Sequence, residues 1–591
     1  MHVYHESDIP YIIADKRKNT LKIKLDVENH IFNSVNILYG DSYDYEDNRD
    51  HGWRYSQKEM QLCYAVEEMQ TWAVEIDIPK WRRIKYSFLL TDSIGEKYLY
   101  NEYGCQRKIM AEISQLVDSY HSHFFYPYIW EKDLISYPDW VSKTIWYQIF
   151  PERFCHADAS TYSNKAWEDT KPKPDSFYGG DLHGIIKQLD YLKELGINGI
   201  YLTPVFIAES NHKYDTINYY EIDSHFGSKE TLKTLVEKAH KKGMRVILDG
   251  VFNHVSSKHP FWQDVLKNQA ESKYKDFFCI REFPVDSSKE YCKSLNYDTF
   301  SFVANMPKLN YENPKVKEYV LSVIGFWIKE CDIDGWRFDV GNELSFSFYS
   351  ALKRQLRPIK DDFYIVAEIW HDCGKWLRNG YIDASMNYLM GSSIKKYAIQ
   401  GTLNAHAFNQ RYFHLMNKLS LIHRTLCFNL LDSHDTPRIM TESDNDKIKV
   451  KNAFLMLFLL PGSPCIYYGS EIGLCGGPDP DNRRPMLWKE GEADMELFNF
   501  FQRLIAFRKK NSDFIQNANL YYENQDKISI WNFSDENSCY WLVHNQTDKK
   551  IDLSGYSVIL SSDENEEKML IPESMALVKY EQRIGNKVVL T

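Results

Sequence analysis

Short strand-like runs alternate with longer amphipathic stretches from about residue 143 onward, and this rhythm constrains the fold more than any other feature of the chain. Two of the stretches, residues 182–196 and 228–243, end in a glycine, which is typical of a helix C-terminus. Eight alternations predict an α/β fold, a (β/α)8 TIM barrel, rather than an open sheet. The runs are 144–150, 199–205, 245–251, 335–340, 364–370, 381–387, 425–433 and 465–473.

A different pattern, of strand-like segments without intervening helices, flanks this region on both sides. Short β-rich runs separated by turn-forming residues fill the first part of the chain and return near its end, a pattern typical of β-sandwiches. We therefore expect an N-terminal β-sandwich over 1–125, the barrel over 126–510 and a C-terminal β-sandwich over 511–591. The longest gap in the barrel, 254–310 after the third run, predicts a small inserted subdomain.

Composition narrows the possible partners and compartment. The net charge of -11 argues against a nucleic-acid or anionic-membrane partner. The 11 cysteines are odd in number and form no Cys-x-x-Cys pair, which favours reduced thiols over disulfides or a zinc site. No secretory signal is visible, and the longest apolar run, 453–460, is too short to span a membrane and predicts a buried helix. We expect a cytoplasmic protein.

Polar side chains follow several of the strand-like runs. In a (β/α)8 barrel the loops after the strands form the working face, so these side chains should meet. A single charged residue there more often caps the next helix, but four successive groups are not explained that way. The groups are Asp249, Asn253 and His254; Arg337 and Asp339; Glu368; and His434 and Asp435.

The chemistry suited to this set is glycoside hydrolysis, which uses two carboxyl groups that flank the scissile bond. Arg337 and Asp339 are two residues apart in a strand, so their side chains share a face, and the arginine can keep the carboxylate ionised. The second carboxyl must hold a proton near neutral pH, which like charges and desolvation favour. Glu368 comes between Asp339 and Asp435 in strand order and meets that need.

Four segments closely resemble the short sequence regions of the α-amylase family, glycoside hydrolase family 13. They are "DGVFNH" (249–254), "GWRFDV" (335–340), "AEIW" (367–370) and "LLDSHD" (430–435). The resemblance implies that Asp339 is the nucleophile, Glu368 the general acid/base and Asp435 the transition-state stabiliser. Arg337, His254 and His434 would support them.

Further segments resemble the neopullulanase, cyclomaltodextrinase and maltogenic amylase group of that family, among them "MPKLN" (306–310) and "NHKYDT" (211–216). The resemblance implies that Tyr214 stacks on the sugar that carries the reacting carbon, with His212 beside it. It also implies that Trp370 lines the acceptor side and that Glu343 influences the balance between hydrolysis and sugar transfer. The N-terminal sandwich is similar to a carbohydrate-binding module of family 34, which commonly serves dimerisation, so a homodimer is expected.

Members of the group often bind calcium through the loop after the first strand. Here that loop reads "FCHADASTYS" (154–163) and keeps Asp158, as the later segment keeps Asp181, but His156, Thr161 and Tyr162 occupy apparent ligand positions. Calcium takes six to eight oxygen ligands, so we expect a weak or absent site and no required cofactor. The triplet "HSH" (121–123) is interpreted as surface, not as a metal site.

Our main hypothesis is a retaining α-glucan hydrolase that cleaves α-1,4 bonds, with some transglycosylation. Cyclodextrins, maltooligosaccharides and pullulan are the candidate substrates, and the sequence does not rank them. Because fold does not fix function, a non-catalytic glucan-binding protein is one alternative. A predominantly glucan-transferring enzyme is the other.

Overall fold

The computed structural model describes most of the chain. The described residues are 2–47, 51–66, 68–108, 112–113, 117, 122–157, 167, 171–288, 291, 293–489, 491–525, 527–563 and 568–580. They form two compact units, one made of 1–136, 402–425 and 513–591, the other of 137–401 and 426–512.

The second unit is an eight-stranded parallel barrel, as the alternating pattern predicts. The strand order is β21-β20-β19-β18-β15-β14-β23-β22, and a parallel bridge between Met386 and Phe428 joins the two ends of the sheet. The strands are buried except at Arg245, the first residue of β18, so their sequences are apolar runs rather than alternating patterns. They are β14 (Trp146–Ile149), β15 (Gly199–Leu202), β18 (Arg245–Gly250), β19 (Gly335–Phe338), β20 (Tyr364–Ala367), β21 (Ala384–Ser385), β22 (Phe428–Asn429) and β23 (Ser463–Tyr467).

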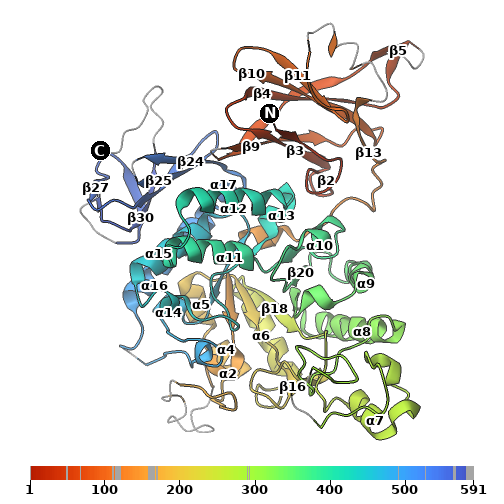
Figure 1. The fold of residues 1–591 in the computed structure, drawn as a ribbon. Helices are drawn as coiled ribbons and strands as arrows, with labels where there is room; N and C mark the ends of the chain where they lie inside the picture. Colours follow the sequence, from red (N-terminus) through yellow and green to blue (C-terminus); the bar gives the residue numbers. More distant parts are fainter. Residues whose placement is uncertain are drawn as a thin grey trace. The chain divides into compact units, whose positions relative to one another are not determined.

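Helices follow the barrel strands and surround them (Figure 1). The two glycine-terminated stretches are helical: Gly196 ends α5 with a φ of 99°, and Ser228 opens α6 with a capping box. The apolar run 453–460 lies within α15 except for its last residue and is buried, as predicted. The main helices are α4 (Leu182–Lys187), α5 (Leu189–Leu195), α6 (Lys229–Lys241), α8 (Pro314–Cys331), α9 (Phe346–Leu356), α10 (Gly374–Arg378), α11 (Tyr388–Ile394), α15 (Lys447–Leu459) and α16 (Met495–Lys510).

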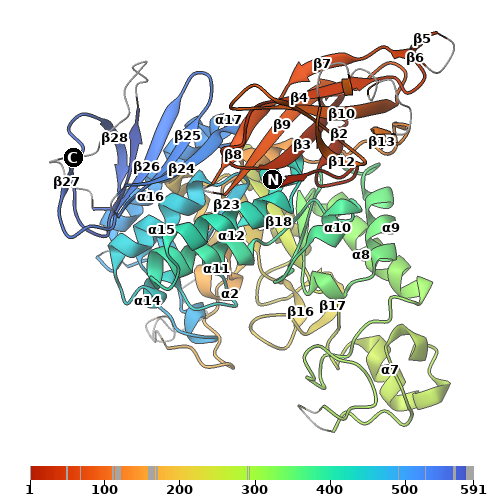
Figure 2. The same cartoon turned by 45° about the horizontal axis from the view of Figure 1, so that its top comes forward.

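Two excursions leave the regular barrel pattern. The predicted insertion after the third strand carries α7 (Pro260–Asn268) and lies outside the ring of barrel helices in both views (Figures 1 and 2). A second, smaller excursion follows β15 and forms a hairpin of β16 (Phe206–Ala208) and β17 (Thr216–Ile222). The loop between these two strands, residues 209–215, holds the segment "NHKYD".

The first unit consists mainly of antiparallel strands. One sheet runs in the order β1-β3-β9-β8-β24-β25-β26-β30-β28, and a second runs β12-β11-β10-β4-β7. The N-terminal strands are β1 (Val3–Tyr4), β3 (Thr20–Glu28), β4 (Phe32–Gly40), β7 (Ser56–Glu59), β8 (Gln61–Ala65), β9 (Met69–Asp77), β10 (Ile84–Asp92), β11 (Lys97–Asn101) and β12 (Gly104–Arg107). The C-terminal ones are β24 (Asn519–Gln525), β25 (Ile528–Ser534), β26 (Cys539–Asn545), β28 (Ser557–Ser561) and β30 (Met575–Lys579).

Alternate residues of these strands fill the sandwich core, as period-two patterning requires. Leu21, Ile23 and Leu25 of β3 face Ile37 of β4 and Phe88 of β10 in one apolar cluster. The parallel pair β8–β24 joins the N-terminal strands to the C-terminal ones in one sheet. The unit also contains α12 (Ala405–Asn417), which comes from an excursion of the barrel chain.

The surface interpretation of the triplet "HSH" is wrong for His123. Its ring is fully buried and contacts Ser87 Oγ at 2.8 Å and the Val117 carbonyl at 2.9 Å. The polarity of the triplet led to the surface interpretation, because the sequence does not distinguish a buried histidine with two hydrogen-bond partners from an exposed one. His121 lies outside the described residues. Among the described helices, none is both long and apolar enough to cross a membrane.

Candidate active site

Neighbouring strand ends bring three carboxyl groups onto one arginine. Arg337 lies beside Asp249 in the β18–β19 register, and its Nη1 is 2.8 Å from both Asp249 Oδ1 and Asp339 Oδ1. Its Nη2 is 2.9 Å from Glu368 Oε2, at the end of β20. Only 1% of the Arg337 side chain is exposed, so the guanidinium is a buried cation in a fixed position.

One guanidinium does not balance three carboxylates. Burial raises the pKa of Asp339 well above its ordinary value, Arg337 opposes this, and the charges of Glu368 and Asp249 add to the rise. Burial likewise raises the pKa of Asp249 to about 6, despite Arg337. Arg337 favours the ionised form of Asp339, as expected from the sequence, but it is shared with two other carboxyls.

Glu368 is held by donors from two sides. The Val340 backbone N–H donates to Oε2 at 3.0 Å, and the Trp370 indole N–H donates to Oε1 at 3.0 Å. Val340 adopts φ 45° and ψ 45°, a left-handed conformation that is strained for a β-branched residue. The turn after β19 thus aims one backbone N–H at the carboxyl at the end of the next strand.

A second group surrounds Asp435, after β22. His434 Nε2 lies 3.1 Å from Asp435 Oδ2, and Gln148 Nε2 lies 2.6 Å from His434 Nδ1. Burial, with Arg483 and Arg337 nearby, lowers the pKa of His434 well below its ordinary value, so the ring is neutral. Arg483 Nη2 is 3.5 Å from Asp435, and its Nη1 is 2.9 Å from Asp479.

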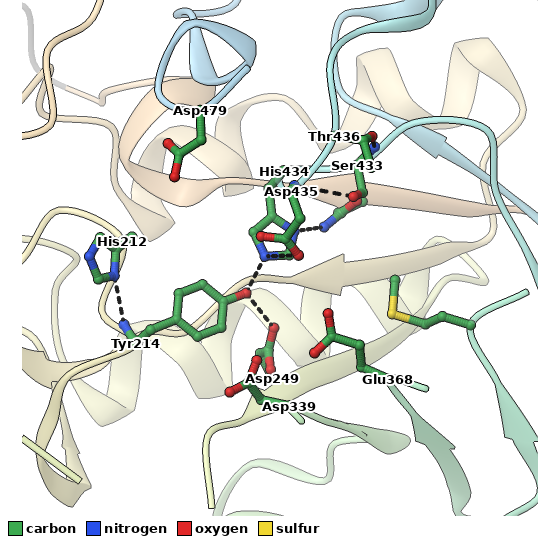
Figure 3. Close-up of polar contacts among 12 residues, drawn as sticks. His212, Tyr214, Asp249, Asp339, Glu368, Ser433, His434, Asp435, Thr436 and Asp479 are labelled. Carbon is green, nitrogen blue, oxygen red and sulfur yellow. Dashed lines mark hydrogen bonds and ion pairs between the residues drawn. The ribbon is translucent and has the colours of Figure 1, made fainter. Parts of the chain in front are cut away.

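Tyr214 links the two groups (Figure 3). Its hydroxyl donates to Asp249 Oδ2 at 3.0 Å and contacts His434 Nε2, and its ring is parallel to the His434 ring within 2°. His212 accepts from the Tyr214 backbone N–H at 3.1 Å, and His254 contacts the Tyr214 carbonyl at 3.1 Å. Burial lowers the pKa of His212 to about 3 and that of His254 to about 4, so both rings are neutral.

A cavity of about 450 Å³ opens above these residues. Seven of the ten residues predicted for catalysis and substrate binding line it: His212, Tyr214, His254, Asp339, Glu368, Trp370 and Asp435. Arg337 and His434 do not line the cavity themselves, but they contact two residues that do, Asp339 and Asp435. Trp370 is 45% exposed and stacks on Tyr388 at 3.6 Å, which presents a flat apolar face at the cavity.

Glu343 does not line the cavity; its neighbour Asn342 does. The Glu343 carboxylate instead pairs with Lys308 of the "MPKLN" segment, and Lys308 also donates to Asn253. The predicted influence of Glu343 on the balance between hydrolysis and sugar transfer stays a prediction.

The predicted calcium ligands are only partly described. Asp158 lies outside the described residues. Asp181 accepts from the Gly184 backbone N–H at 2.5 Å and so caps α4. Within the described part of the chain, no three His, Cys, Asp or Glu residues are grouped to hold a metal ion. The Asp181 carboxylate already accepts a backbone hydrogen bond at the start of α4.

Sequence reasoning missed several residues that line the cavity. Phe300 and Val303 come from the insertion and carry no chemical signal in sequence, because apolar residues there resemble subdomain core; Met306 stands in the quoted segment "MPKLN", but nothing in the sequence placed it at the cavity. Asp479 and Arg483 do carry one: they are an acid and a base four residues apart in a polar loop. Asp249 was noticed at a strand end, but its place as the third carboxyl on Arg337 needed the register of β18 and β19.

Comparisons with known proteins identify the family of the chain. The family model of the α-amylase catalytic domain matches residues 148–518, and that of the α-amylase N-terminal Ig-like domain matches 1–130. A cyclomaltodextrinase of Geobacillus thermopakistaniensis (strain MAS1) is 43% identical over 510 residues, covering 86% of this chain and 84% of the relative. The intracellular maltogenic amylase of Bacillus subtilis (strain 168) is 39% identical over 535 residues, covering 90% and 87%.

A solved structure of a cyclomaltodextrinase superposes with a TM-score of 0.84 at 34% identity, covering 98% of this chain and 99% of the other. Both the barrel and the flanking sandwich regions are therefore shared with a known architecture. The catalytic-domain match contains the strand ends that carry Arg337, Asp339, Glu368 and Asp435. The chain belongs to the α-amylase family of glycoside hydrolases.

Proposed function

We propose that the protein is a retaining α-glucan hydrolase that cleaves α-1,4 bonds of cyclodextrins, maltooligosaccharides and pullulan, with some transglycosylation. The observation that carries the proposal is the meeting of Asp339 and Glu368 on Arg337 at the cavity that Trp370 and Tyr214 line. The names of the relatives, cyclomaltodextrinase and maltogenic amylase, support this substrate class.

In the proposed reaction, Glu368 donates its proton to the glycosidic oxygen while Asp339 attacks the anomeric carbon. The bond to the leaving sugar breaks, and a covalent glycosyl-enzyme forms. Glu368 then takes a proton from water, whose oxygen displaces Asp339 and restores the starting configuration. The same group serves as acid and then as base.

The charge arrangement suits a cationic transition state. Positive charge that develops on the sugar ring adds a second cation beside the carboxylates on Arg337, and these carboxylates stabilise that charge as the bond breaks. Asp435, held by Arg483 and neutral His434, contributes a further negative charge to the same cavity. The site is thereby more complementary to the transition state than to the neutral substrate.

Substrate choice is tested by comparing kcat/KM for γ-cyclodextrin, pullulan and soluble starch in a reducing-sugar assay. We expect γ-cyclodextrin to exceed starch, and activity to fall at least about 10⁴-fold in Asp339→Asn. Near-normal activity of that variant would refute the assignment of the nucleophile. A clear preference for starch would contradict the cyclodextrin assignment.

A predominantly transferring enzyme is the second candidate, and the exposed face of Trp370 favours it. An acceptor sugar can stack on this ring beside Glu368, which then deprotonates a sugar hydroxyl instead of water. Chromatography of the products at high maltose separates the two. Transfer would give longer saccharides in amounts comparable to the glucose that leaves, and hydrolysis would give glucose without longer saccharides.

We also propose that activity needs no metal, that the protein is a homodimer and that it works in the cytoplasm. The use of the Asp181 carboxylate as a helix cap supports the first, and the description of the Bacillus subtilis relative as intracellular supports the third. Calorimetric titration of chelator-treated protein should show no micromolar calcium binding. Light scattering should give twice the 69.9 kDa mass of the chain.

A further inference from the structure

Lys213 lies between His212 and Tyr214, two residues that line the cavity, yet its own side chain turns away from it. The residue is fully buried, and its backbone has a φ of 62°, a left-handed conformation that lysine rarely adopts. A buried lysine in a strained turn is costly unless something holds it there. The structure shows what holds it.

The Lys213 ammonium bridges the loop end of β16 and the residue that follows β17. It donates to Asp223 Oδ2 at 2.7 Å and to the Ala208 carbonyl at 2.9 Å. Ala208 is the last residue of β16, and Asp223 follows β17, so one amine fastens both strand ends to the loop between them. The Lys213 backbone N–H also donates to Ser210 Oγ at 3.0 Å.

Asp223 is itself fixed from several sides. Its Oδ2 accepts from the Ala208 N–H at 3.2 Å, and its Oδ1 accepts from the His225 N–H at 3.0 Å. The His225 ring lies 2.7 Å from Oδ1, and Lys213 is the cation at Oδ2. The partner of Lys213 is therefore a carboxylate with a defined position rather than a mobile surface group.

We propose that Lys213 and Asp223 are positioning residues, which hold the turn of residues 210–215 so that Tyr214 meets Asp249 and His434. The proposal rests on the proposed function, because it concerns hydrolysis at this cavity. The pair acts only through that turn and touches no substrate. Buried ion pairs are often no more stabilising than apolar residues of similar shape, so stability alone does not account for the pair.

A double-mutant cycle with Tyr214 tests the proposal. Lys213→Met and Asp223→Asn are combined, so that neither leaves a buried charge without a partner. The pair of changes is made in the native chain and in a Tyr214→Ala chain, and kcat/KM is measured on p-nitrophenyl α-maltotrioside. Lys229→Met with Glu330→Gln, which removes a partly exposed ion pair of the same barrel at 2.8 Å, is the matched control.

In the native background we expect the double change to lower kcat/KM by about 10- to 100-fold, since a displacement near 1 Å at a reacting site has effects of that size. In the Tyr214→Ala background we expect no more than about a 2-fold loss, because the changes act through the missing ring. The control should be unchanged in both. Equal losses in the two backgrounds overturn the proposal.

Two further measurements keep the outcomes separate. The melting temperature of the double variant should stay within about 3 °C of the native one. If the double variant does not fold, Asp223→Asn alone, which keeps an acceptor for Lys213, enters the same cycle with the same criterion. A native protein that releases no product would sink the proposed function, whereas an active native protein with additive losses would sink only this inference.

Discussion

At the scale of single residues, Arg337 decides the electrostatics of the site. It stands between Asp249, Asp339 and Glu368, and two of these carboxyls have a raised pKa although the cation touches them. The sequence identified the charged members of this cluster, because polar residues at the ends of buried runs are conspicuous. It did not indicate that one cation serves three acids, since that depends on the register between strands.

Asp339→Asn should make the protein more stable while it abolishes activity. Folding raises the pKa of this carboxyl, so ionisation favours the unfolded chain once the pH exceeds the unfolded-state pKa of about 3.9. The resulting loss of stability grows with pH until the carboxyl ionises in the native state too. The amide removes that cost and leaves Arg337 two carboxylates. Calorimetry should give a melting temperature at least about 2 °C higher at pH 7.5, with a smaller difference at pH 4.5.

The exposed Asp175→Asn is the control for that comparison and should change neither value. A lower melting temperature of Asp339→Asn at pH 7.5 would show that its bond to Arg337 outweighs the repulsion.

Arg337→Lys should be destabilising, because an ammonium cannot span three carboxyls as the planar guanidinium does. At least one buried carboxylate then has no cation partner, which costs about 3–5 kcal/mol of unfolding free energy. The loss should be smaller at pH 5 than at pH 7.5, since the acids with a raised pKa are protonated there. Urea denaturation at both pH values measures it, and an equal loss at both would speak against the charge argument.

At the scale of elements, the barrel was the most predictable part of the fold. Eight buried runs and the glycine signals at the ends of α5 and α6 were sufficient for it. The strands themselves are shorter than the runs, down to two residues in β21 and β22, because the sequence cannot separate ladder residues from the loops that continue them. The contribution of the insertion to the cavity wall was not predictable, because its apolar residues resemble core residues in the sequence although they face the cavity.

Two glycines in helices should respond oppositely to alanine. A Cβ on Gly184 of α4 would lie 2.0 Å from the Cys155 carbonyl oxygen, whereas one on Gly325 of α8 would meet nothing closer than Ile359 at 3.9 Å. We expect Gly184→Ala to cost about 3 kcal/mol or more through the clash. Gly325→Ala should add about 0.5–1 kcal/mol by lowering the entropy of the unfolded chain. Thermal unfolding of the pair checks both, and a stable Gly184→Ala protein would contradict the first.

At the scale of the whole molecule, the sandwich regions are less separate than the sequence suggests. Leu520 of β24 pairs with Tyr64 of β8, a contact between segments more than 450 residues apart that no local pattern could indicate. Lys24 of β3 is fully buried and donates to the carbonyls of Asn417, at 2.6 Å, and Leu419, at 3.2 Å. The N-terminal strands thus hold the end of α12, which the barrel chain supplies.

Deleting residues 1–125 should therefore yield an aggregating chain rather than a working barrel, because β24 would lose β8 and become an exposed edge strand. Lys24→Met is the point counterpart and should lower the unfolding free energy by about 1–3 kcal/mol, since two buried carbonyls lose their donor. Size-exclusion chromatography and urea denaturation test the two. A monodisperse truncated protein with native kcat would disprove the dependence.

The hydrogen bond from the Trp370 indole to Glu368 makes the site its own optical reporter. An indole beside a carboxyl group emits differently when that group gains a proton, and a half-exposed ring also shifts its emission when a sugar covers it. The difference spectrum between the native protein and Trp370→Phe therefore isolates one signal among 15 tryptophans. Followed against pH, it reads out when the proposed proton donor is loaded, without any substrate being turned over.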